Sequence, residues 1–533
     1  PPRSTLFPYT TLFRSGASEG GRDYNHVDVS RISLFQNYLP AYKKAIDAGA
    51  RMIMTSFNTL DYVPCTTNKF LLRDVLRTLW RFDGVTISDY DSLQQTIAHG
   101  FSEDQKEAAK EGIFAGLDIE MASTCYLSHV EELIAKGEIT LDLIDEAVLR
   151  ILELKRDVGL FENPFKGANA ALEEQLVYSK EHMEATLRVA HESMVLLNNN
   201  GILPLKKNVK IALIGPYSES RSTVGPWSWH GRRDYHPTLA EALKDQSIYV
   251  NSKESMDLYS DEEINELKQA DVILCAIGEK ERESGEAHSK TDLTIPRNQS
   301  SLVQLAKSLQ KPCVVLLHHG RPLLLDSIQE ADAILDVFFL GSSHAEAVKD
   351  VLLGHVNPSG KLTMSYPRHG GQIPVYYNSL NTGRPYLGKD DHNEYVSKYL
   401  DCENTPLYPF GHGLSYSNFV YSNLELSSNQ LVKNQTLHVS IDILNDSDWP
   451  GYETVLLFLR DHVGRVVRPV MELKDYQKVY FNAHETKTIH FEVNESMLEY
   501  YIDNGVTMKE PGRFTLFIGS SSTTYLSQPF EYK

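Results

Sequence analysis

The periodicity of apolar residues changes along this chain, and the change restricts the fold more than any other feature. From residue 16 to about 165, and again from 190 to about 368, short apolar runs alternate with helical segments, which is typical of βα units. Past residue 415 the period becomes two, as in strands with one buried face. A chain of 533 residues also exceeds one hydrophobic core. We therefore predict a multidomain protein of α/β regions followed by an all-β region.

The first α/β region ends its apolar runs in polar residues. Its strand candidates cover 51–58, 84–91 and 112–121. After Thr140, one face of a long amphipathic helix carries Ile144, Val148, Ile151 and Leu152. Three strands cannot close a (β/α)₈ barrel, which needs about eight. We therefore predict that 16–165 is the C-terminal part of a TIM barrel.

The second α/β region has strands that are apolar on both faces. They are predicted at 210–216, 271–279, 312–320 and 332–341, with helices around 261–270, 297–310 and 343–353. Strands of this kind indicate a parallel sheet that is covered on both sides. We predict an α/β sandwich at 190–368, preceded by a linker at 166–189.

The last region alternates strictly, as in Leu437, Val439, Ile441 and Ile443. This pattern predicts a small antiparallel sandwich of immunoglobulin or fibronectin type III kind at 415–533. The Gly- and Pro-rich stretch at 369–414 is expected to be a connection on the surface.

The first fifteen residues, PPRSTLFPYTTLFRS, share neither period with the rest of the chain and contain TLF twice. They resemble the translation of a sequencing-adapter oligonucleotide. We treat 1–15 as artefactual, with a disordered native tail as the alternative. The native sequence would then begin near Gly16, in the middle of a protein, and any export signal would precede it.

Composition excludes several kinds of partner. A net charge of −19 argues against nucleic acid, whose binding requires Lys and Arg, and favours a neutral substrate. No apolar run is long enough for a membrane span. The five cysteines lack CxxC spacing, and Cys275 and Cys313 are expected to be buried thiols. His318 and His319 are adjacent, so their side chains diverge in a strand, and we predict neither a metal nor a cofactor.

Two groups of carboxylates could carry chemistry. Asp89 directly ends the apolar run GVTIS, where barrel enzymes place catalytic groups, and position alone leaves it open between a catalytic and a structural role. Asp91 is expected to cap the next helix. The loop after 271–279 carries Glu279, Glu281, Glu283 and Glu286. Such a loop is most often a solvated charged segment, but glycoside hydrolysis requires two carboxyl groups that face one sugar.

Taken together, several strings resemble glycoside hydrolase family 3, and in particular its periplasmic β-glucosidase branch. They are GASEGGRDYNHVDVS, GVTISDYD, AVLRILELKRDVGLFENP, AHESMVLLNNNGILPL, TDLTIPRNQ, GHVNPSGKLTMSYPR, GQIPVYYN and YPFGHGLSY. The resemblance runs from Gly16 to the end of the chain and implies an N-terminally truncated member. It implies a retaining β-glucosidase in which Asp89 is the nucleophile and Glu286 the acid/base, with Glu283 as the fallback. It also implies that Tyr90 and Trp227 clamp the leaving group.

Two departures from the family's pattern affect the expected activity. Relatives carry a Lys-His pair that grips sugar hydroxyls just before GGRDYN, where this chain has residues 1–15. We therefore expect the chain as written to be inactive and a longer parent to be active. The other departure is Phe57, a substrate-contact candidate at a position where many relatives have Tyr.

The expected substrates are oligosaccharides or aryl and alkyl β-glucosides, and the expected compartment is the periplasm or the exterior. A homodimer is left open as the assembly. The rival interpretations are a β-xylosidase or exo-glucan hydrolase on the same scaffold, since pocket loops decide the sugar. A protein that only binds carbohydrate is the rival from another class.

Overall fold

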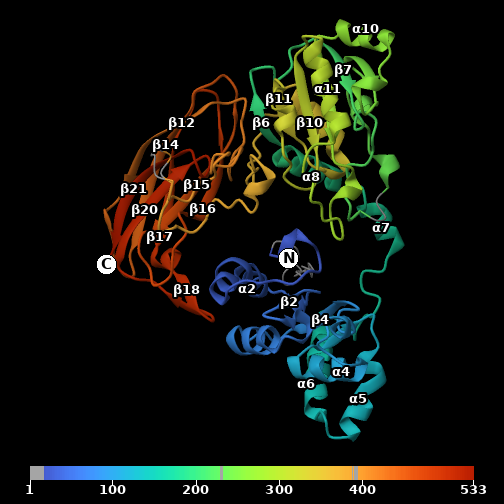
Figure 1. The fold of residues 1–533 in the computed structure, drawn as a ribbon, viewed down its shortest axis with the longest axis vertical. Helices are drawn as coiled ribbons and strands as arrows, with labels where there is room; N and C mark the ends of the chain where they lie inside the picture. Colours follow the sequence, from blue (N-terminus) through green and yellow to red (C-terminus); the bar gives the residue numbers. More distant parts are fainter. Residues whose placement is uncertain (1–16, 229–231, 387, 389–393) are drawn as a thin grey trace. The chain divides into compact units, whose positions relative to one another are not determined.

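The computed structural model describes residues 17–228, 232–386, 388 and 394–533, so the segment predicted to be artefactual, 1–15, lies outside the described residues. The chain divides into two compact units. The first comprises Pro1–Glu173 and Glu499–Met508, and the second Glu174–Leu498 and Lys509–Lys533. Figure 1 labels the main helices and strands along the chain.

The first unit is built on a parallel sheet with the strand order β1-β4-β5. Its strands are β1 (Met52–Met54), β4 (Val85–Tyr90) and β5 (Ile119–Met121). Its helices include α2 (Leu39–Asp47), α3 (Gln95–Ala98), α4 (Gln105–Ala115), α5 (Cys125–Ala135) and α6 (Leu141–Asp157), together with π-helical turns at Leu34–Tyr38 and Phe70–Leu79. This alternation of strands and helices confirms the predicted partial barrel.

The strand predicted at 112–121 is wrong in its first half. The Asp104 side chain accepts a hydrogen bond from the Glu107 amide and so caps α4, which runs to Ala115. Gly116 ends the helix in the left-handed conformation, with φ 94°. Only Ile119–Met121 is extended, because the apolar residues around Ile113 cover the sheet from a helix instead.

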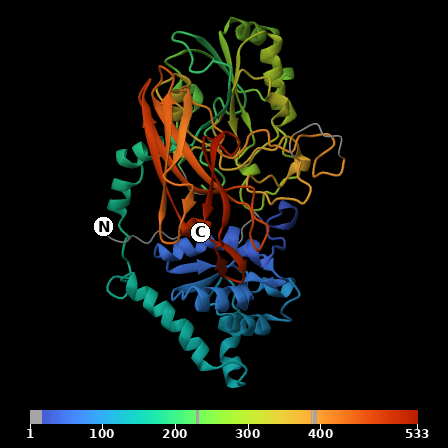
Figure 2. The same ribbon diagram turned by 90° about the vertical axis from the view of Figure 1, so that its left-hand side faces the viewer.

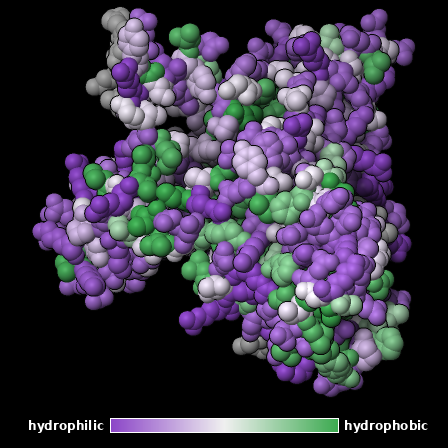
Figure 3. Space-filling model, turned by 60° about the horizontal axis from the view of Figure 1, so that its bottom comes forward, coloured by the Kyte–Doolittle hydropathy of each residue, from purple (hydrophilic) through white to green (hydrophobic). Residues whose placement is uncertain are grey.

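The predicted closing helix is confirmed as α6, but none of its residues is fully buried. Val148 is 45% exposed and Leu152 is 43% exposed. Figure 3, which brings the bottom of Figure 1 forward, shows such apolar patches among mainly hydrophilic side chains. The amphipathic pattern of this helix therefore predicts its existence and not its burial.

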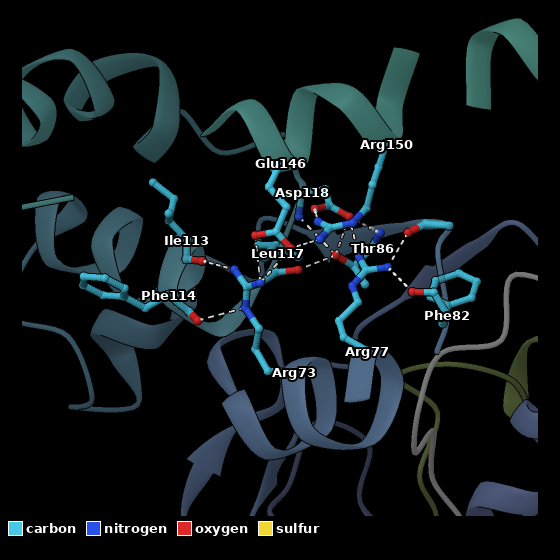
Figure 4. Close-up of polar contacts among 12 residues, drawn as sticks. Arg73, Arg77, Phe82, Thr86, Ile113, Phe114, Leu117, Asp118, Glu146 and Arg150 are labelled. Carbon is cyan, nitrogen blue, oxygen red and sulfur yellow. Dashed lines mark hydrogen bonds and ion pairs between the residues drawn. The ribbon is translucent and has the colours of Figure 1, made fainter. Parts of the chain in front are cut away.

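Ion pairs hold α6 against the sheet (Figure 4). Asp118, whose side chain is 1% exposed, lies 2.8 Å from Nη2 of Arg77 and 2.6 Å from Nη1 of Arg150. Asp118 also accepts hydrogen bonds from the amide and hydroxyl of Thr86. Glu146 of α6 forms an ion pair with Arg73, with 2.9 Å between Oε1 and Nη1. Burial is the main cause that lowers the pKa of Arg77 to about 10, and the Asp118 charge opposes it.

A hairpin from the far end of the chain belongs to the first unit. It consists of β18 (Tyr500–Asp503) and β19 (Val506–Met508). The Tyr501 ring lies 5.5 Å from the Phe35 ring, and the Tyr501 amide donates to the side-chain oxygen of Gln36 at 3.1 Å. A segment 465 residues away in sequence therefore completes this unit.

The second unit contains a six-stranded sheet with the order β6-β11-β10-β9-β7-β8. The strands are β6 (Val195–Asn199), β7 (Lys210–Ile214), β8 (Ser247–Asn251), β9 (Val272–Gly278), β10 (Cys313–His318) and β11 (Ala333–Asp336). All neighbours pair in parallel except β6, which runs antiparallel to β11. The predicted α/β sandwich is confirmed, with two edge strands, β6 and β8, that sequence reasoning did not identify.

Two apolar clusters cover the two faces of this sheet, whose ribbon Figure 2 shows turned by 90° from the view of Figure 1. Successive residues of β9 alternate between them: Ile273 and Cys275 face one cluster, and Val272 and Leu274 the other. The helices are α8 (Lys180–Ser193), α9 (Leu239–Ala242), α10 (Asp261–Gln269), α11 (Arg297–Ser308) and α12 (His344–Leu352). Helices α10 and α11 pack on one side, and α8, α9 and α12 on the other. The expected burial of Cys275 and Cys313 is confirmed.

The C-terminal β-sandwich pairs a sheet of order β12-β14-β17 with one of order β13-β21-β20-β15-β16. Its strands are β12 (Phe419–Leu426), β13 (Gln430–Leu431), β14 (Thr436–Asn445), β15 (Gly451–Asp461), β16 (Glu472–Phe481), β17 (Thr486–Asn494), β20 (Gly512–Gly519) and β21 (Tyr525–Tyr532). The alternating residues of β14 and β20 all enter one core. Within the described ranges, no helix is both long and apolar enough to cross a membrane.

Candidate functional site

Asp89 lies at the C-terminal end of β4 in the first unit. It is 7% exposed, and its Oδ1 accepts a hydrogen bond from the Tyr90 amide at 2.7 Å. Ser88 fixes the backbone beside it, since its hydroxyl donates to the Asp89 carbonyl at 2.8 Å and accepts from the Met121 amide of β5 at 2.8 Å. The strand end therefore holds this carboxylate in one orientation, at the edge where barrel enzymes carry their chemistry.

The residues around Asp89 form a small rim. Tyr90 is 67% exposed. Phe57, after β1, is half-buried and packs edge-on against Tyr24 with ring centroids 5.1 Å apart. Tyr24 belongs to the GGRDYN string. The carbonyl of Asn25 in the same string accepts a hydrogen bond from the side-chain amide of Asn58. Sequence reasoning did not assign Tyr24 a role, although the string that contains it is one of those on which the family resemblance rests.

Asp91 does not cap the next helix as predicted. Helix α3 begins only at Gln95, and its N-terminus has no side-chain cap. Asp91 instead adopts the left-handed conformation, with φ 59°, and its carbonyl accepts from the Gln95 amide. A tight turn, rather than a capping box, therefore follows the strand that carries Asp89.

The carboxylate loop of the second unit follows β9 at the point where the strand order reverses. The chain runs from β7 outward to β8 and then returns to β9 on the other side of β7. In open α/β sheets, such a switch point opens a crevice at the carboxyl ends of the strands, and ligands bind there. The topology thus places the loop of Glu279 to Glu286 at the favoured edge.

Glu279, Glu281 and Glu283 of this loop each pair with a cation. Glu279 is fully buried and lies 3.0 Å from Lys290 and 3.2 Å from Arg321. Glu281 is 4% exposed and lies 2.8 Å from Arg233; burial raises its pKa, and Arg233 opposes that effect. Glu283 receives Lys290 at 3.2 Å. Burial raises the pKa of Glu283, but the Lys280 amide and Lys290 outweigh this and leave it lowered.

Glu286 occupies the outer turn of the loop and is half-buried. Gly285 and Ala287 on either side of it are both left-handed, with φ 93° and 63°, so the backbone turns sharply there. A Cβ at Gly285 would lie 2.8 Å from Pro226 and 3.6 Å from Nε1 of Trp227. The structure therefore brings Trp227, which is 57% exposed, beside the turn that carries Glu286.

The two adjacent histidines after β10 have separate structural partners. His318 Nε2 lies 3.1 Å from Nε2 of His344, and the His318 ring stacks on Tyr217 with centroids 3.9 Å apart. His319 Nε2 lies 2.8 Å from Asp336 and 2.8 Å from the Tyr366 hydroxyl. Within the part of the chain that the structure covers, no group of three metal-ligating side chains gathers.

Family models match most of the chain. The glycosyl hydrolase family 3 N-terminal domain matches residues 13–154, and the C-terminal domain of the same family matches residues 194–416. A fibronectin type III-like domain matches residues 453–522. The three matches follow the same order as the barrel part, the α/β sandwich and the β-sandwich.

Individual proteins are similar over the same span. A periplasmic β-glucosidase of Salmonella typhimurium is 37% identical over 97% of this chain and 72% of its own length. A β-xylosidase of Formosa agariphila is 32% identical over 93% of this chain and 71% of its own length. The crystal structure of a β-glucosidase from Listeria innocua in complex with glucose superposes with a TM-score of 0.93 at 40% identity, covering 98% of this chain and 73% of that one.

Proposed function

Because the chain belongs to glycoside hydrolase family 3, we propose that it carries the site of a retaining, exo-acting β-glucosidase that releases terminal non-reducing glucosyl residues from oligosaccharides. The observation that supports this most is the similarity, over nearly the whole chain, to a β-glucosidase crystallised with glucose. The uncharged sugar also suits a chain whose net charge is −19.

In this proposal Asp89 attacks the anomeric carbon while Glu286 protonates the glycosidic oxygen. Glu286 then removes a proton from the water that releases the sugar from Asp89. The strand-end position of Asp89 supports its role. The position of Glu286 in a sharp turn beside Trp227 supports its role.

The aromatic residues complete the proposed site. Tyr90 and Trp227 would flank the leaving group with their exposed rings, and Phe57 would contact the sugar in the cleaved position. Ring faces pack well on the C–H surfaces of sugars. A retaining mechanism also requires the two carboxyl groups to come within about 5 to 5.5 Å in the closed complex.

The roles can be tested with aryl β-glucosides whose leaving phenols differ in acidity. The assay uses a longer parent protein that contains this chain, because the chain covers 72% of the length of the similar periplasmic β-glucosidase. Asp89→Asn should lower kcat for all of them. Glu286→Gln should lower kcat about 10² to 10⁴-fold for poor leaving groups, and much less for acidic phenols that need no proton. Glu283→Gln serves as the matched control.

Two results would overturn the assignment. If Asp89→Asn hydrolysed aryl glucosides at the original rate, a protein that only binds carbohydrate would be favoured. If the loss of kcat depended on leaving-group acidity in Glu283→Gln, and not in Glu286→Gln, Glu283 would be the acid/base. A fluorinated glucosyl fluoride that reacts to a long-lived glycosyl-enzyme can trap the nucleophile. Its sugar should be found attached to the peptide that contains Asp89.

The similarity to a β-xylosidase supports a second candidate function on the same site. The ratio of kcat/KM for an aryl glucoside and the matching aryl xyloside separates the two. We also propose a periplasmic location for the parent protein, supported by its similarity to a periplasmic enzyme. Fractionation of cells that produce the parent, with the activity found in the cytoplasm, would contradict it.

A further inference from the structure

We propose that a pocket of the α/β unit, outside the catalytic loop, binds a second neutral sugar unit. The choice of a sugar, though not the existence of the pocket, rests on the proposed function. The cavity measures about 430 Å³, within the range of small-molecule sites in proteins. It lies between α8, the segment from Val224 to Ser228 and the turn after Leu340.

His236 is the polar residue that points to a ligand. It lines the cavity and is only 2% exposed. Neither of its ring nitrogens has a hydrogen-bond partner among the described residues. A buried polar group without a partner is costly, because it loses its bonds to water and gains none. A ligand in the cavity would supply the missing partners.

The protonation state of His236 indicates which kind of ligand fits. Burial is the main cause that lowers the pKa of this imidazole; the charge of Asp234 opposes it, and Arg221 and Arg233 add to it. The neutral ring offers one N–H donor and one nitrogen acceptor. A hydroxyl group can satisfy either atom, whereas a carboxylate or phosphate accepts only. A compound with several hydroxyl groups therefore matches His236 better than an anion.

The rest of the lining suits an uncharged ligand. Among the described residues, no Asp, Glu, Lys or Arg lines the cavity, so a charged ligand would enter without a counter-ion. Ser228 and Ser342 provide hydroxyl groups, and Val189 and Leu340 provide apolar contact. A wall of this mixed kind can receive both the hydroxyl groups and the C–H faces of a sugar ring.

An aromatic ring forms one side of the cavity. Tyr178 stacks on Tyr235 with centroids 5.3 Å apart and 16° between the planes. The Arg232 guanidinium lies 4.0 Å from the centre of the Tyr235 ring. This stack fixes the Tyr178 ring before any ligand binds, which lowers the entropy lost on binding.

The cavity also adjoins the loop that carries Trp227. Ser228 lines the cavity, and its neighbour Trp227 lies against Gly285 in the turn that precedes Glu286. A sugar in the cavity would therefore contact the segment that positions Trp227. The second site could hold a distal sugar unit or a released glucose, both of which have the same recognition chemistry.

The test is calorimetric titration of glucose into the full chain that carries Asp89→Asn and Glu286→Gln, so that turnover plays no part. Binding should remain in this background. His236→Leu, which keeps the bulk and removes both nitrogens, should weaken it about tenfold or more. His236→Gln, which keeps a donor and an acceptor, should bind better than the Leu variant and shows whether loss comes from chemistry rather than misfolding.

His438→Leu in β14 is the matched control, because His438 is an exposed histidine of the β-sandwich, and it should leave the affinity unchanged. Glucose should also slow amide hydrogen exchange across residues 178–189. The proposal is overturned if His236→Leu binds glucose as well as the background does, if the background binds none, or if glucuronate binds more tightly than glucose. Failure of the proposed enzyme would show separately, as unchanged hydrolysis by Asp89→Asn in the parent protein.

Discussion

The buried pair His318 and His344 should make the stability of the α/β unit depend on pH. Nδ1 of His318 lies 3.0 Å from the Leu316 carbonyl and 3.3 Å from the Ile277 carbonyl, so this nitrogen must carry the proton. In the neutral ring, His318 Nε2 then accepts the hydrogen bond from His344 Nε2. Nδ1 of His344 is left buried without a partner among the described residues. A further proton would therefore find no acceptor there.

The size of the effect follows from the pKa of His344. Burial lowers it from 6.5 to about 3, and burial lowers the pKa of His318 well below its usual value. Because the folded pKa is the lower one, the unfolded chain takes up a proton that the folded chain does not. Stability is complete above pH 6.5 and falls as the pH drops toward 3. At about pH 5, His344 alone should cost about 2 kcal/mol of the free energy of unfolding.

The assay is urea unfolding of the full chain at about pH 7.5 and about pH 5. A short pulse of hydrogen exchange, read on peptides from β9 to β11, reports the α/β unit alone. His344→Gln keeps an N–H donor for His318 but does not titrate, so it should lose about 2 kcal/mol less than the original chain between the two pH values. The exposed His438→Gln should behave like the original. Equal losses for His344→Gln and the original chain would refute the argument.

Three further changes have defined outcomes. Asp118→Asn leaves the half-buried Arg77 without its carboxylate partner and removes one of the two partners of Arg150, so it should cost about 3 kcal/mol, which thermal unfolding measures. Tyr501→Ala removes the ring that packs on Phe35 and should destabilise the first unit by about 2 kcal/mol, seen as faster proteolysis of that unit. Gly285→Val places a side chain at φ 93° and against Pro226, so the turn should be destabilised by about 1 to 3 kcal/mol and kcat/KM for aryl glucosides should fall in the parent protein.

Periodicity predicted the classes of element well because burial repeats along each strand and helix. Residues 437 to 443 alternate in sequence, and all four apolar members enter the core of the β-sandwich. The same reasoning failed around Ile113, because a short apolar run fits a strand or the buried side of a helix. It also missed β6, whose antiparallel pairing with β11 depends on contacts between residues more than 130 positions apart.

The candidate site was predictable only in part. Asp89 could be located because its strand is local in sequence. The partners of His318, the hairpin of Tyr501 and the unpaired His236 could not, since each depends on residues from distant elements. Sequence spacing shows which residues are neighbours along the chain, whereas hydrogen-bond partners depend on the packing of whole elements.

The choice among the four loop glutamates shows what the structure adds. In the sequence all four lie within eight positions and are chemically equal. In the fold, Glu279 points into the sheet edge between Lys290 and Arg321, and Glu281 is buried against Arg233. These contacts bury both carboxylates against their cations and keep the loop in place. Glu286 lies further along the loop, between two left-handed residues and beside Trp227, and this position is the reason why we propose it as the acid/base. The buried ion pairs thus hold the turn in position, and under the proposed mechanism Glu279→Gln should lower kcat/KM for aryl glucosides through the position of Glu286.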